Sequence, residues 1–100
     1  MNNKEKKLKK LIERESEKRK LQIEIDKVEI KDNKKIKIHI LSASLFNTTE
    51  IFMDKQEIKV KSSYQIIDTK ELYPESEIEE KLKDIFEKNK EEIEKILKKS

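Results

Sequence analysis

Hydrophobic and polar positions follow two different periods along the chain, and the first segment has the helical one. Within residues 3–20 the apolar positions are Leu8, Leu11 and Ile12, spaced as on one side of a helix, without glycine or proline. No apolar residue follows from 13 to 20. The pattern predicts a basic N-terminal helix over residues 1–20, docked through its middle. The alternative is a basic arm that becomes ordered on an acidic partner.

The period then changes to two, which is typical of strands with one buried face. Apolar and polar residues alternate through residues 21–31, with a slip of phase at Asp26 and Lys27, and again through residues 35–40. A slip of phase inside a strand predicts a β-bulge or a break. Asp32 and Asn33 separate the two runs and predict a turn, so the segment is expected to form a hairpin.

Residues 46–51 resemble the start of a helix. Asn47 is a capping residue, Glu50 has the capping-box spacing, and Phe46 with Ile51 has the spacing of a hydrophobic staple. We therefore predict a short helix over residues 48–55. A strand through residues 50–53 is the competing interpretation.

Two elements complete the chain. Residues 58–66 alternate again and predict a further strand with a basic outer face. Ser76 and Glu79 form a second capping-box pattern at the start of an amphipathic helix over residues 76–99. Asn89 interrupts its apolar stripe, which consists of Ile78, Leu82, Ile85, Phe86, Ile93, Ile96 and Leu97.

The order of elements is α-β-β-(short α)-β-α, which predicts an α+β domain over residues 1–100. Its sheet region, residues 21–67, is expected to hold three or four antiparallel strands packed against the N- and C-terminal helices. The predicted core consists of Leu11, Ile23, Ile36, Ile38, Ile40, Phe46, Ile58, Val60, Ile66, Leu82, Ile85 and Phe86.

Composition narrows the class of protein. Charged residues make up 47% of the chain and hydrophobic residues 33%, with no cysteine and no glycine. Disulfides, Cys-ligated zinc and thiol catalysis are therefore excluded, and the longest apolar run, residues 51–53, is far too short for a membrane span or a signal sequence. We expect a cytoplasmic protein. The excess of lysine and isoleucine indicates an AT-rich genome, such as that of a phage or another mobile element.

The residues that carry chemistry do not form a catalytic pattern. His39 stands among lysines that would repel a metal cation, and we expect it on a solvent-facing strand position. A phosphate-binding loop needs glycine, which the chain lacks. The sequence therefore predicts no enzyme, no cofactor and no metal site.

A basic sheet face is the first candidate for a binding site. It consists of Lys27, Lys31, Lys35, Lys37, Lys59 and Lys61. Lysines in such a pattern suit phosphates or an acidic partner. Against nucleic acid, no aromatic residue is expected between these lysines to stack on a base. The alternative is an ordinary solvated face.

The distal part of the final helix is the second candidate. A straight helix over residues 76–99 would project past a small sheet and expose Ile93, Ile96 and Leu97. These residues would then form an interface, and a homodimer through residues 85–97 is one outcome. The alternative is packing within the monomer, under the first helix.

Residues 28–50, with isoleucine-rich paired strands followed by Ser44-Leu45-Phe46-Asn47, resemble part of the N-terminal domain of the Gram-positive replicative polymerase PolC. The resemblance covers about a third of the chain. It implies a KH-like, non-catalytic module that binds protein, with a longer central helix than the one expected here.

These observations rank three functions. The first is a small, non-catalytic protein that binds another protein, as an inhibitor or adaptor. The second is a nucleic-acid-binding module that uses the lysine face. The third is an accessory domain of the replication machinery, as the resemblance implies.

Overall fold

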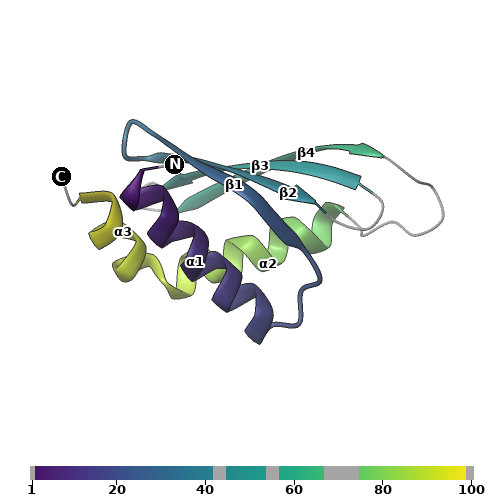
Figure 1. Cartoon of the computed structure of the whole chain (residues 1–100), viewed down its shortest axis with the longest axis horizontal. Coiled ribbons are helices and arrows are strands. Elements are labelled where there is room, and N and C mark those ends of the chain that lie inside the picture. The colour runs from purple at the N-terminus through teal and green to yellow at the C-terminus, as the bar shows by residue number, and fades with distance from the viewer. Residues whose placement is uncertain (1, 42–44, 54–56, 67–74, 99–100) are drawn as a thin grey trace.

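The computed structural model has the predicted α+β architecture (Figure 1). It describes residues 2–41, 45–53, 57–66 and 75–98, and the side chains of residues 45, 64–66, 75 and 76 are not described. The expectations for Ile66 and for the cap at Ser76 concern side chains that are not described. The elements are α1 (Asn3–Lys18), β1 (Glu24–Lys31), β2 (Lys35–Leu41), β3 (Leu45–Met53), β4 (Ile58–Ile66), α2 (Glu75–Lys88) and α3 (Lys90–Lys98).

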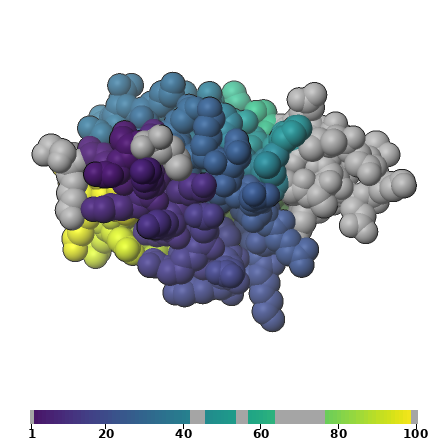
Figure 2. All heavy atoms as spheres, in the orientation of Figure 1, coloured from purple at the N-terminus to yellow at the C-terminus, as the bar shows by residue number. Residues whose placement is uncertain are grey.

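The four strands form one antiparallel sheet in the order β1-β2-β3-β4, so each strand pairs with its neighbour in the chain. All three helices lie on the same side of this meander (Figure 1). In the space-filling view the blue and teal strands form the upper boundary of the molecule, and the purple and yellow helices lie below them (Figure 2). The result is two layers, with one face of the sheet covered and the other open.

The first hairpin has both features that the sequence predicts. The register between β1 and β2 shifts between Ile25 and Lys27, which is a β-bulge at the slip of phase. Asp32 and Asn33 have φ values of 56° and 57°, and the N–H of Lys34 donates to the carbonyl of Lys31. Positive φ at both central residues is the requirement of a type I′ turn, which asparagine and aspartate tolerate better than most residues.

The helix predicted over residues 48–55 is wrong, because residues 48–53 belong to β3; residues 54 and 55 lie outside the described residues. Asn47, Thr49 and Ile51 point into the core, while the residues between them face outward. Thr48 and Thr49 are β-branched, which favours a strand. Pairing with β2 on one side and β4 on the other outweighs the local helix-start pattern. The central helix implied by the polymerase-domain resemblance is also missing here.

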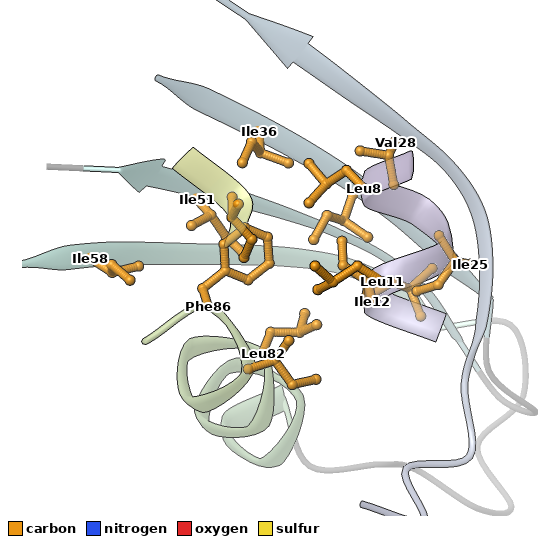
Figure 3. Close-up of a cluster of buried hydrophobic side chains, with 14 of the residues drawn as sticks. Leu8, Leu11, Ile12, Ile25, Val28, Ile36, Ile51, Ile58, Leu82 and Phe86 are labelled. Atoms are coloured by element: carbon orange, nitrogen blue, oxygen red, sulfur yellow. The ribbon is translucent and has the colours of Figure 1, made fainter. Parts of the chain in front are cut away.

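The core lies between the sheet and the helices (Figure 3). Leu8, Leu11 and Ile12 of α1 face Val28 and Ile36 of the strands, and Phe86 and Leu82 of α2 close the same cluster (Figure 3). The predicted core residues that are buried are Leu11, Ile36, Ile38, Ile40, Ile58, Leu82, Ile85 and Phe86.

Three predicted core residues are not fully buried: two are partly buried and one is exposed. Ile23 and Val60 are partly buried and pack against the cluster. The core assignment of Phe46 is wrong, because its side chain is 49% exposed. The cause is the strand register: Phe46 is out of phase with Asn47, Thr49 and Ile51, and therefore points to the open face.

Helix α1 begins and ends with well-formed caps. Asn2 and Glu5 form a capping box, in which each side chain accepts a hydrogen bond from the other residue's backbone N–H. At the far end the N–H of Lys20 donates to Glu17 and the N–H of Leu21 to Ser16, the two bonds of a Schellman motif. Lys20 has a φ of 55° in the position that usually holds glycine.

The predicted single helix over residues 76–99 is divided at Asn89 into α2 and α3, which run in different directions (Figure 1). The Asn89 side chain and backbone N–H both donate to the carbonyl of Ile85, while the Asn89 carbonyl accepts from Ile93. Because of this bend, α3 packs beside α1 instead of projecting past the sheet. None of the described helices is long and apolar enough to span a membrane.

An ion-pair network joins α1 to α2. Arg19 donates to the Glu15 carboxylate at 2.8 Å and to Asp84 at 3.1 Å. The Glu15 side chain is only 10% exposed, so its charge needs a close cation. The hydrogen bond from Arg19 lowers the pKa of Glu15 and also that of Asp84.

A glutamate from a helix binds each edge strand of the sheet. Glu5 Oε2 of α1 accepts a hydrogen bond from the N–H of Ile30 on β1 at 2.9 Å. Glu79 Oε1 of α2 accepts one from the N–H of Ser62 on β4 at 3.0 Å. These bonds occupy backbone donors on strands that have only one sheet neighbour.

Candidate binding surface on the open face of the sheet

Strand alternation divides the sheet residues between the two faces. Positions that alternate with the buried isoleucines project away from the helices, and the strand register aligns them into rows across the sheet. We define the open face as Glu24, Lys27, Glu29, Lys31, Lys35, Lys37, His39, Leu41, Phe46, Thr48, Glu50, Phe52, Lys59, Lys61 and Ser63.

The structure brings all six lysines of the predicted basic face together on this surface. Lys31, Lys35 and Lys59 lie in one row with Phe52 between the last two, and Lys37 and Lys61 flank Glu50 in the next row. Lys27 pairs with His39 in the third row. Six lysines against Glu24, Glu29 and Glu50 leave the face with a net charge of 6 − 3 = +3. Whether the face binds anything remains a prediction.

Two phenylalanines lie on the same face, contrary to the expectation that no aromatic residue stands among the lysines. Phe52 is 44% exposed and Phe46 is 49% exposed, and both are on β3. The Lys35 ammonium lies 5.4 Å from the centre of the Phe52 ring. The sequence argument missed both rings because it assigned this segment to a helix. The two adjacent threonines were the signal that could have revealed the strand.

Carboxylates neutralise one side of the open face. Glu29 lies 3.0 Å from Lys27, 3.9 Å from Lys31 and 3.5 Å from His39. The hydrogen bond from Lys27 and the surrounding cations lower the pKa of Glu29. Positive charge over β1 is therefore largely compensated.

Over β3 and β4 fewer of the lysines are paired with a carboxylate. Glu50 pairs with Lys35 at 3.1 Å, and that hydrogen bond lowers its pKa. In the part of the chain that the structure describes, no carboxylate forms a salt bridge with Lys37, Lys59 or Lys61. The positive charge of these three lysines is therefore the least compensated on the open face. Both exposed phenylalanines lie on β3, in the same half of the sheet.

His39 occupies the strand position that the sequence predicts. It lies on the open face, 3.5 Å from a Glu29 oxygen, and its Nε2 atom has no hydrogen bond although it is buried. Among the described residues there is no group of three His, Cys, Asp or Glu side chains that could hold a metal ion.

The residues predicted as a second interface have a different environment from the one expected. Ile93 is fully buried and Leu97 is 3% exposed, while Ile96 is partly buried against the core. The expected overhang is wrong, because the bend at Asn89 turns α3 towards α1. The proposed homodimer loses the exposed aliphatic side chains on which it rested.

Hollows also occur away from the centre of the open face. One of about 460 Å³ lies between the start of α1, Asn33 and Ile96, where Lys4 donates to the carbonyl of Leu97. Another of about 300 Å³ is lined by Glu13, Glu17 and Glu24 near the start of β1.

Compared with known protein families, curated proteins and solved structures, the chain matches none of them significantly.

Proposed function

We propose that this chain is a non-catalytic binding protein and that the open face of its sheet is the binding surface. The observation that supports the proposal is the arrangement around β3: exposed phenylalanines lie on the same uncovered face as Lys37, Lys59 and Lys61. Exposed aromatic side chains leave apolar area in water, and a ring next to a lysine that has no salt bridge within the described residues, as Phe52 is to Lys59, is suited to binding a partner.

The surface selects a partner by chemistry. Its lysines favour negative charge, and its rings favour a flat or apolar group that can lie on them. A partner that supplies only charge would leave both phenylalanines in water. We therefore expect the partner to present anionic and apolar or aromatic groups side by side.

A pair of matched triple variants tests this proposal. The face variant is Lys37→Gln/Lys59→Gln/Lys61→Gln. The control variant, Lys6→Gln/Lys10→Gln/Lys83→Gln, removes the same charge from exposed helix positions. Glutamine retains the length of the side chain, and circular dichroism with urea unfolding would verify that both variants fold.

The two variants and the wild type are each immobilised on a support and incubated with cell extract at low salt. Captured protein and captured nucleic acid are both quantified. We expect the wild type and the control to retain the same component and the face variant to retain several-fold less. Equal retention by the face variant, or no retention by the wild type, would overturn the proposal.

A further inference from the structure

The surroundings of Phe52 resolve the partner chemistry further. Its neighbours across the ladder are Lys35 on β2 and Lys59 on β4, so a lysine stands on each side of the ring. The Lys35 ammonium lies over the ring, 5.4 Å from its centre, and pairs with Glu50, so a flat group can lie only on the part of the ring that Lys35 leaves uncovered. Lys59 has no salt bridge within the described residues. An aromatic ring beside a cation suits a ligand in which a flat ring and an anion alternate.

Resting on the proposed function, we infer that the open face binds single-stranded nucleic acid. A base stacks on Phe52, and the adjoining phosphates lie against Lys37, Lys59 and Lys61. An unpaired base exposes its π face for such stacking, whereas the bases of a duplex are covered by their neighbours. Because every base has a π face, we expect little dependence on sequence.

An acidic protein partner fits the same surface less well. Protein interfaces depend on side chains anchored in pockets, and of the two hollows described above only one reaches the open face, at its margin, through Glu24. A strand of nucleotides needs no pocket, because phosphates can follow lysines along a flat sheet. Glu50 lies in the middle of the face, but its charge is compensated by Lys35 at 3.1 Å.

Phe46 defines the far end of the surface. It stands six residues from Phe52 on the same strand and face, which at 3.3 Å per residue is about 20 Å. Its neighbours across the ladder are Leu41 and Gln65, so no lysine flanks it. We expect Phe46 to contribute less to binding than Phe52, and the site to cover only a few nucleotides.

The test is a titration of labelled oligothymidylate and of a duplex of equal length, each at two salt concentrations. We expect the single strand to bind more tightly than the duplex. Phe52→Leu retains apolar bulk but removes the ring, and loss of one stacked base weakens binding by roughly 5- to 150-fold. Phe52→Tyr retains the ring and should bind as the wild type does, which separates stacking from a general effect on the strand.

The lysines are tested through the salt dependence. The face variant Lys37→Gln/Lys59→Gln/Lys61→Gln should reduce the slope of log K against log salt by about 2, since each phosphate contact on a single strand contributes roughly 0.7. The helix-side control variant should leave the slope unchanged. Equal slopes for the two variants, or equal affinities of Phe52→Leu and wild type, would contradict the assignment.

Failure of this inference can be distinguished from failure of the proposed function. If oligothymidylate does not bind, while capture from nuclease-treated extract still depends on Lys37, Lys59 and Lys61, the open face binds a protein and the nucleic-acid assignment is wrong. If capture is also independent of these lysines, both proposals are wrong. Preference for the duplex would overturn the role of Phe52 while leaving a phosphate-binding face.

Discussion

The same four strands build two faces with opposite chemistry. On β2, Ile36, Ile38 and Ile40 are buried under the helices, while Lys35, Lys37 and His39 alternate with them on the open face. On β3 the alternation places Ile51 inside and Phe52 outside. The buried face has apolar side chains because water is absent there, but no such rule requires exposed phenylalanines on the other. The covered face therefore maintains the fold, whereas none of the open-face residues belongs to the core cluster.

The largest expected difference between the faces is in stability. Ile38→Ala removes a fully buried side chain under the helices and should lower the free energy of unfolding by about 2–5 kcal/mol. Its neighbour on the open face, Lys37→Ala, should change stability by less than about 0.5 kcal/mol. Urea unfolding of both variants measures this contrast. Comparable losses would mean that the open face is covered in solution.

The stability of the helical layer that covers the buried face is expected to depend on Arg19, which links α1 to α2. Arg19→Met removes the hydrogen bonds to Glu15 and Asp84 but retains most of the apolar stem. We expect a loss of about 1–2 kcal/mol, because Glu15 remains largely buried without its closest cation. Thermal unfolding at neutral pH measures the change. A Tm equal to that of the wild type would show that apolar packing alone joins α1 to α2.

Acid should weaken the same network. Arg19 lowers the pKa of Glu15 and Asp84 in the folded state, so the unfolded chain takes up protons first as the pH falls. The stabilisation is present at neutral pH and is lost as the pH drops below the usual carboxylate range, through the folded pKa values. We expect Arg19→Met to have a shallower fall in Tm between about pH 5 and pH 3 than the wild type. Parallel curves would contradict the coupling.

A smaller effect, in the opposite direction, is expected at the end of α1. Lys20 has a φ of 55° in the glycine position of a Schellman motif. Lys20→Gly relieves this conformation at the cost of a more flexible unfolded chain, and should raise stability by about 0.5–1 kcal/mol. Lys10→Gly, at an exposed position inside the helix, should lower it by a similar amount. If both substitutions destabilise the protein, the left-handed conformation of Lys20 does not lower the free energy of unfolding.

The smallest effect on stability is expected on the open face itself. Glu50→Gln breaks the ion pair with Lys35 between the two central strands, on the open face, and should leave the urea midpoint unchanged within error. It should nevertheless strengthen oligothymidylate binding, because one negative charge leaves the surface. A fall in affinity would indicate that Glu50 positions Lys35 for the ligand.

The sequence was a good guide wherever one local pattern decided the outcome. The hairpin, its bulge at Asp26 and its turn at Asp32 follow from alternation and turn chemistry, and the six lysines share a face because a strand has a period of two. The prediction failed at residues 48–55, where a local helix-start pattern competed with pairing to two strands. Only that pairing places Phe46 on the open face and Phe52 between Lys35 and Lys59.

Other features depend on contacts that no local pattern contains. The capping box of Asn2 and Glu5 could have been read from its spacing, but the bond from Glu5 to Ile30 joins residues 25 apart. The bend at Asn89 coincides with the gap that Asn89 makes in the apolar stripe. Its effect on Ile93 and Leu97 depends on where α1 lies.

The two glutamates at the sheet edges have a consequence for how the chain is made. Glu5 precedes the sheet in the chain and Glu79 follows it. During synthesis, the carboxylate that accepts from β1 is therefore made before the sheet, and the carboxylate that accepts from β4 is made after it. A nascent chain that ends after β4 therefore has one protected edge and one edge open to pairing with another chain. The Ser62 N–H on β4 gains its acceptor only when α2 has been synthesised and has docked.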